Sequence, residues 1–175
     1  GTFSVGVSTP TWVGGRLGQA VSLDGVDDFV QANQTGQFDN LNAITVSAWV
    51  YPKASWNKAF TYIRNQITGQ NNGFGIGGSW DGTASSRIYI GSQAYDFSGV
   101  AEPAVDRWTH IAFTYDTATK KIVFYKNATA ATEKTGPGTP IAASTQAFVV
   151  GKSGGTDGSS YKFNGFIDDV RVYNR

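Results

Sequence analysis

The sequence contains neither cysteine nor methionine, and it has few of the residues that build helices. With no cysteine, a disulfide scaffold, a thiolate zinc site and a cysteine nucleophile are all excluded. Leucine occurs only three times and glutamate only twice, as Glu102 and Glu133, among 175 residues. Because both residue types favour helices, their scarcity argues against a helical fold.

Long apolar runs and an excess of one charge are also missing. No segment approaches the roughly 20 apolar residues that a membrane-spanning helix needs. The 14 basic and 13 acidic side chains give a formal net charge of +1, and the basic residues are scattered, which argues against a polyanion as partner. We therefore expect no nucleic acid or membrane partner, and a monomer of one domain covering residues 1–175.

Residues that favour β-sheets are abundant. The chain has 15 valines, 10 isoleucines and 18 threonines, and aromatics make up 14%, a composition suited to pleated surfaces. Short runs of these residues alternate with Asp-Gly and Asn-Gly turn signals. An all-β fold is predicted, with strands at 20–23, 28–31, 44–51, 59–65, 73–77, 87–91, 109–115, 121–126, 146–150 and 166–173.

The alternation within two segments predicts how the layers are arranged. In Thr109 to Tyr115 the odd-numbered residues form an apolar face, which predicts a core-facing side. The segment Thr45 to Tyr51 has large apolar groups on both faces, which predicts a central strand covered on both sides. Two packed antiparallel sheets are therefore expected.

Four separated blocks carry a family resemblance. They are WVGGRLGQAVSLDGVDDFV from Trp12, VSAWVYP from Val46, WTHIAFTYD from Trp108 and FNGFIDDVRVYNR from Phe163. In this order they resemble the laminin-G-like domains of the concanavalin A-like lectin and glucanase superfamily. The resemblance implies an antiparallel β-sandwich of the jelly-roll type. It also implies a secreted or cell-surface location, within a larger bacterial protein.

Acidic residues gather at two places. Asp24, Asp27 and Asp28 surround a glycine turn, and Asp168 and Asp169 interrupt an apolar strand. A carboxylate is costly to bury unpaired, and calcium accepts six to eight oxygen ligands in flexible geometry. Strict alternation places Asp168 on one face with Phe166, Val170 and Val172, and Asp169 on the other with Arg171.

The resemblance also implies a structural calcium near the final strand. We therefore expect Ca²⁺ to be bound by Asp168 foremost, and by Asp24 and Asp28. The alternative is that Asp24 and Asp27 cap the turn through backbone hydrogen bonds while Asp169 forms an ion pair with Arg171.

Aromatic side chains in polar loops are candidates for stacking on sugar rings. Trp12, Trp49 and Trp108 belong to the family blocks and are expected in the core. The expected ligand-binding residues are Trp56, Trp80, Tyr95 and Tyr161, with Arg64 as a polar contact. The alternative is that these loop aromatics fold back over the rim of the sandwich.

A catalytic constellation is not recognisable. Glycoside hydrolysis usually requires two facing carboxyl groups, and neither Glu102 nor Glu133 has a carboxylate neighbour in sequence. The single histidine, His110, is expected to be packed at a strand edge. We therefore predict no enzyme but a carbohydrate-binding module that contacts a poly- or oligosaccharide and the neighbouring domains of its parent chain. The alternative is a structural or adhesion domain that binds no sugar.

Overall fold

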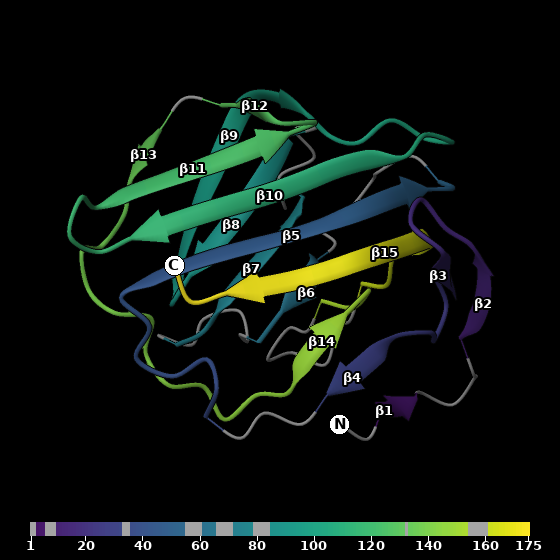
Figure 1. Ribbon diagram of the computed structural model, residues 1–175, viewed down its shortest axis with the longest axis horizontal. Coiled ribbons are helices and arrows are strands. Elements are labelled where there is room, and N and C mark those ends of the chain that lie inside the picture. The colour runs from purple at the N-terminus through teal and green to yellow at the C-terminus, as the bar shows by residue number, and fades with distance from the viewer. Residues whose placement is uncertain are drawn as a thin grey trace.

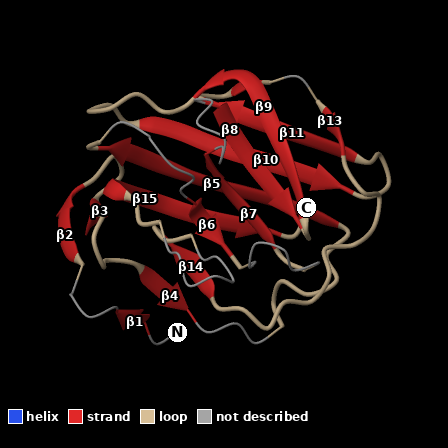
Figure 2. Ribbon diagram, turned by 180° about the vertical axis from the view of Figure 1, so that it is seen from behind, coloured by secondary structure: helices blue, strands red, loops and turns tan. Residues whose placement is uncertain are grey.

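The computed structural model describes residues 3–5, 10–32, 36–54, 61–65, 72–78, 85–131, 133–153 and 161–175. Every regular element in this part of the chain is a β-strand (Figure 2). The strands form two antiparallel sheets that face each other (Figure 1). The predicted all-β, concanavalin A-like sandwich is thereby confirmed.

One sheet has seven strands and lies behind the other in Figure 1. Its edges are formed by β1 (Phe3–Val5) and β9 (Gln93–Ala101), and all neighbouring strands are antiparallel. In spatial order it contains β1 (Phe3–Val5), β4 (Val30–Ala32), β14 (Phe148–Val150), β6 (Thr61–Arg64), β7 (Phe74–Gly78), β8 (Ser85–Ile90) and β9 (Gln93–Ala101).

The other sheet has eight strands and faces the viewer in Figure 1. In spatial order it contains β12 (Thr129–Ala130), β11 (Lys121–Lys126), β10 (Thr109–Asp116), β5 (Ala43–Pro52), β15 (Asn164–Tyr173), β3 (Gln19–Asp24) and β2 (Thr11–Gly14). The short β13 (Lys134–Thr135) pairs with the other end of β11.

The core lies between the inner faces of the two sheets. Phe74 of β7 packs on Phe113 of β10 with ring centroids 6.3 Å apart, and Phe97 of β9 packs on Phe124 of β11 at 5.7 Å. On β10 the predicted face is confirmed, because Thr109, Ile111, Phe113 and Tyr115 are all buried. Burial of such aromatic and aliphatic side chains is the main favourable term in the folding of the sandwich.

Strand β5 is central, as predicted, but only one of its faces is fully covered. The even-numbered residues from Ile44 to Val50 are completely buried. Trp49 and Tyr51 point to the other side and are only half-buried. The expectation of cover on both sides was therefore wrong, because in the part of the chain that the structure describes no second layer lies over this outer face of the eight-stranded sheet.

A β-bulge changes the faces of β15. Asp168 lies opposite Trp49 and Arg171 opposite Ser47, so β15 has one residue more than β5 in this stretch. Asp169 takes up the extra residue with a positive φ of 48°. As a result Val172, opposite the buried Val46, packs towards the core, while Arg171 is exposed. Strict alternation had placed Val172 on the same face as Phe166. That grouping was wrong, because Phe166 stacks on Tyr51 on the outer face.

Candidate functional site

Asp168 is buried, and two backbone donors hold its carboxylate. Its Oδ2 accepts from the N–H of Leu17 at 2.8 Å, and its Oδ1 accepts from the N–H of Asp169 at 2.7 Å. The donor Leu17 belongs to the turn after β2, which the Gly15 N–H to Gly18 carbonyl bond closes at 3.0 Å. A Cβ on Gly15 would lie 2.5 Å from Oδ2, so the glycine allows this close approach. The buried charge is therefore compensated by hydrogen bonds from the chain itself.

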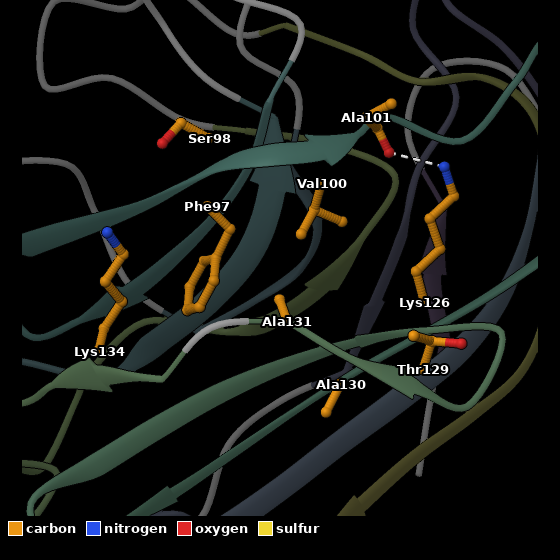
Figure 3. A pocket seen from close by; sticks show the side chains of 9 residues that line it. All are labelled: Phe97, Ser98, Val100, Ala101, Lys126, Thr129, Ala130, Ala131 and Lys134. Atoms are coloured by element: carbon orange, nitrogen blue, oxygen red, sulfur yellow. Dashed lines mark hydrogen bonds between the residues drawn. The ribbon is translucent and has the colours of Figure 1, made fainter.

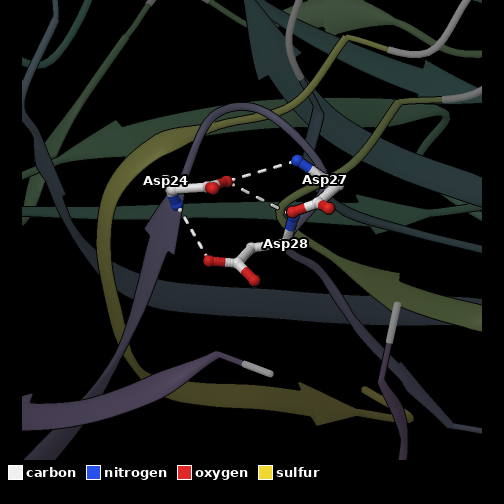
Figure 4. Close-up of side chains that lie close together, drawn as sticks. All are labelled: Asp24, Asp27 and Asp28. Carbon is white, nitrogen blue, oxygen red and sulfur yellow. Dashed lines mark hydrogen bonds between the residues drawn. The ribbon is translucent and has the colours of Figure 1, made fainter. Parts of the chain in front are cut away.

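The other acidic cluster is an Asx-type turn after β3 (Figure 4). The Oδ1 of Asp24 accepts from the backbone N–H groups of Val26 at 2.8 Å, Asp27 at 3.2 Å and Asp28 at 3.4 Å. In return the Asp24 N–H donates to Oδ2 of Asp28 at 3.1 Å. The bond from Val26 is the main reason that the pKa of Asp24 lies below its usual value.

This turn can also hold a metal ion. Asp24, Asp27 and Asp28 each offer a carboxylate oxygen, and these oxygens lie within 4.8 Å of one another. Clustered carboxylates of this kind suit calcium.

Asp168, expected to bind the same ion, does not belong to this group. Asp24 lies opposite Asn164, four residues before Asp168 on β15. At about 3.3 Å per residue, that offset is about 13 Å along the strand. Asp169, the neighbour of Asp168, forms an ion pair with Arg171 at 2.8 Å. This ion pair was part of the alternative to a metal site.

The five residues expected to bind ligand fall into different settings. Trp56 and Trp80 lie outside the described residues. The ring of Tyr95 packs against the core and its hydroxyl donates to Gln93. Tyr161 is half-buried, and its carbonyl accepts from the Ser153 N–H at 2.8 Å. Arg64 is buried, which lowers the pKa of its guanidinium to about 10.

The three tryptophans that were expected in the core lie elsewhere. Trp12 on β2 is 66% exposed. Trp49 and Trp108 are half-buried on the outer face of the eight-stranded sheet. The expectation was wrong because inward positions of β5 and β10 are taken by the neighbours of these residues, such as Val50 and Thr109.

Five rings together form what we call the aromatic platform, on the outer face where β5 ends and β10 and β15 begin. Trp49 meets His110 edge-on at 5.2 Å, and Tyr51 meets Trp108 at 5.4 Å. Phe166 of β15 stacks on Tyr51 at 5.3 Å. All five side chains are half-buried, so each leaves part of its ring open.

Polar and cationic groups surround the aromatic platform. The guanidinium of Arg16 lies 5.1 Å from the ring centroid of Trp49, and the ammonium of Lys53 lies 4.3 Å from that of Phe166. The side-chain Oδ1 of Asn127 accepts a hydrogen bond from the backbone N–H of His110 at 2.9 Å. Partial burial lowers the pKa of His110, so the imidazole is neutral at pH 7. A depression of about 580 Å³ runs between Arg16, Trp49, Trp108, His110, Asn127 and Ala128.

The two glutamates, Glu102 and Glu133, lie in different environments. Glu133 pairs with Lys121 at 2.8 Å on the surface. Glu102 is half-buried, and this burial raises the pKa of its carboxyl group to about 7.

The family model described as the concanavalin A-like lectin/glucanases superfamily matches residues 24–175, which is most of the chain. The chain belongs to the Laminin_G_3 family. The family resemblance seen in the four sequence blocks is thereby confirmed. No curated protein matches the chain.

Solved structures show the same fold as this Laminin_G_3 domain. Domain 4 of AbnA, a GH43 extracellular arabinanase from Geobacillus stearothermophilus solved in complex with arabinotriose, is 22% identical with a TM-score of 0.75. The match covers 98% of this chain and 81% of that one. A carbohydrate-binding candidate from Bacteroides ovatus is 20% identical with a TM-score of 0.64, over 89% of this chain and 43% of that one.

A third structure shows the fold within an enzyme. The enzymatically active domain of tailspike protein 2 from bacteriophage CBA120 is 15% identical with a TM-score of 0.66. The Laminin_G_3 domain covers only 28% of that chain. At these identities the likeness establishes the fold.

Among the described residues there is no helix of the length and hydrophobicity that crossing a membrane requires.

The sequence of the Laminin_G_3 domain did contain the signal for the aromatic platform. If the odd residues of Thr109 to Tyr115 face the core, then Trp108 and His110 must face away from it. In the same way, buried Val46 and Val50 place Trp49 and Tyr51 outside. The expectation that tryptophans of the family blocks lie in the core overrode this alternation.

Proposed function

We propose that this Laminin_G_3 domain is a non-catalytic carbohydrate-binding module of a secreted multidomain protein, and that the aromatic platform contacts the sugar. The observation that carries the proposal is the grouping of partly open Trp49, Tyr51, Trp108 and Phe166 rings on one outer face. Sugar rings present apolar C–H faces, which stack on open aromatic rings. Open aromatic patches on a soluble domain are a mark of interaction sites.

The surroundings of the aromatic platform fit a sugar as well. Arg16, Lys53 and Asn127 supply polar groups that can bond hydroxyls at its rim. The depression of about 580 Å³ has the size of a small-ligand site. The likeness to an arabinanase domain solved with arabinotriose supports a sugar ligand and an extracellular setting.

Binding should depend on the platform tryptophans. We expect Trp49→Ala and Trp108→Ala each to weaken oligosaccharide binding about tenfold, which is about 1.4 kcal/mol, because each removes one stacking face. The measurement is isothermal titration with neutral oligosaccharides, arabinotriose among them. Trp12→Ala is the matched control, because Trp12 is exposed but does not line the platform depression.

Two outcomes would count against this assignment. If the wild-type domain binds no oligosaccharide of a broad panel, the carbohydrate function fails. If the wild-type domain binds but both platform variants bind as tightly as the wild type, the site lies elsewhere. Alanine variants of Trp56 and Trp80 would then be tested in the same way, with those of Tyr95, Tyr161 and Arg64 after them.

A structural or adhesive role is the second candidate, favoured by the exposed apolar residues. Trp12 is 66% and Leu17 is 56% exposed. Trp12 also borders an apolar cavity of about 300 Å³ whose lining includes Val30, Phe148 and Ile167. A neighbouring domain or a protein partner could cover this surface.

We also propose that Asp24, Asp27 and Asp28 bind a structural calcium ion, which would brace the turn after β3. At a calcium concentration 100 times the dissociation constant, the ion would stabilise the domain by about 2.7 kcal/mol. For a domain of this size that corresponds to a melting temperature higher by about 5–10 °C. Thermal unfolding with calcium and after EDTA measures the difference.

Matched asparagine variants locate the ion. Asp24→Asn with Asp28→Asn should abolish the calcium-dependent shift, while asparagine keeps the oxygen that caps the turn. Asp169→Asn should retain the shift, because Asp169 pairs with Arg171 outside the group. A melting temperature that does not respond to calcium, or a response that survives the double substitution, contradicts the site.

A further inference from the structure

A groove of about 670 Å³ lies where the free edges of the two sheets meet. Its walls come from β9, the edge of the seven-stranded sheet, and from β12 and its neighbours in the other sheet. We call it the edge groove (Figure 3). It is lined by Phe97, Ser98, Val100, Ala101, Lys126, Thr129, Ala130, Ala131 and Lys134.

Two lysines of the eight-stranded sheet bracket the edge groove. In Figure 3, Lys134 and Lys126 stand on opposite sides, with Phe97, Val100 and Ala131 between them. Lys126 donates to the carbonyl oxygens of Ala101 at 2.7 Å and of Glu102 at 3.1 Å, which holds its ammonium against the end of β9. The Lys134 ammonium lies 6.0 Å from the ring centroid of Phe97. Lys126 is thus held by hydrogen bonds to the opposite sheet, and Lys134 lies near the Phe97 ring of that sheet.

Acidic side chains do not offset this charge among the described residues that line the groove, since none of these is acidic. Glu133, next to Lys134, turns to Lys121 at 2.8 Å. Glu102, next to Ala101, is half-buried, and the burial raises its pKa to about 7. Partial burial also lowers the pKa of Lys126, as expected of an ammonium that has lost hydration without gaining an anion. The groove therefore favours a negatively charged occupant.

The rest of the lining suits a sugar. Val100, Ala130 and Ala131 supply an apolar surface for C–H groups, and the hydroxyls of Ser98 and Thr129 can bond ring hydroxyls. Ser98 and Thr129 are both exposed. The backbone of β9 adds donors and acceptors, since an edge strand leaves one side of its ladder unpaired. Phosphate alone would use the lysines but not the apolar surface.

We propose that the edge groove binds an acidic oligosaccharide, with carboxylates of its uronate units met by Lys126 and Lys134. This site goes beyond the proposed function, because it shares no residue with the aromatic platform. The two are separated by the tight turn at Asn127 and Ala128, which lines the platform depression while its flanking residues Lys126 and Thr129 line the groove.

The test uses a galacturonate trimer and its methyl ester, which has the same sugars without the charge. Isothermal titration in about 20 mM salt should show binding of the acid, weakened at physiological salt where the Debye length is about 8 Å. Lys134→Gln and Lys126→Gln should each weaken it about five- to tenfold. Lys120→Gln is the matched control, because that lysine is exposed and does not line the groove.

Lys126→Arg keeps the charge and the carbonyl contacts and should restore binding, which separates recognition from folding. Equal affinity for the acid and the methyl ester overturns the proposal. So does an unchanged affinity in Lys134→Gln, or equally tight binding of inorganic phosphate, which would make the groove a general anion site. Trp108→Ala should leave the acidic trimer bound in the groove, so failure of the platform and failure of the groove are distinguishable.

Discussion

Asp168→Ala should lower the free energy of unfolding by about 3 kcal/mol. The substitution removes the acceptor of two backbone N–H groups, those of Leu17 and Asp169, in a buried place. Each donor left without a partner costs about 1–3 kcal/mol. The turn from Gly15 to Gly18, which folds against the carboxylate, would lose its anchor to β15. Urea unfolding followed by tryptophan fluorescence measures the loss.

The metal dependence of that loss decides what Asp168 does. Because its two oxygens accept backbone hydrogen bonds and it stands apart from the Asp24 turn, the loss should be the same with calcium and with EDTA. Asp168→Asn keeps one acceptor oxygen and should cost less than alanine. A loss that disappears in the EDTA-treated protein would show instead that Asp168 acts through a cation.

The sandwich was predictable because its signals are local. Val, Ile, Thr and aromatic residues alternate with Asp-Gly and Asn-Gly turns, and ten strands were placed from that pattern. The alternation in β10 also predicted its buried face correctly. A buried face is a property of one strand and its period of two, so no knowledge of the partner strands is needed.

Edge strands were harder to predict because neighbours, not residue type, define them. Strand β9 was missed although it has nine residues. Its second half contains Ser98 and Gly99, which carry no β preference, and it is held in place by its ladder with β8. The turn after Lys126 has Asn127-Ala128, where tight hairpin turns favour Asn-Gly. It is a tight two-residue turn, with φ of 49° and 64° at these residues.

The aromatic platform was not predicted from the sequence, since it depends on which face of a sheet is covered. Tryptophan is apolar enough for a core and also suited to a binding surface, so its identity alone does not discriminate. Trp49 and Trp108 become neighbours of Phe166 only when β10, β5 and β15 pair in register. The Asp24 turn was found from sequence because its residues are adjacent. Turn capping and metal binding use the same carboxylate oxygens, so the sequence predicted both as alternatives.

Gly165→Ala should destabilise the domain by about 3–5 kcal/mol or prevent folding. Gly165 begins the pairing of β15 with β5, and its φ of 149° is one that residues with a side chain rarely adopt. An added Cβ would lie 2.1 Å from the carbonyl oxygen of Tyr51 and 2.9 Å from the ring of Phe163. Neither neighbour can yield easily, because the first is backbone in a central strand and the second is buried.

Gly14→Ala is the matched control, because a Cβ there meets nothing within 4 Å, and it should change stability by no more than about 0.5 kcal/mol. Gly165 also links the two proposed features of this end of the sandwich. Asn164, just before it, pairs with Asp24 of the acidic turn, and Phe166, just after it, belongs to the aromatic platform. Any Gly165→Ala protein that folds should therefore lose platform-dependent oligosaccharide binding and the calcium-dependent shift together. A variant of wild-type stability would contradict the strained backbone assigned to this position.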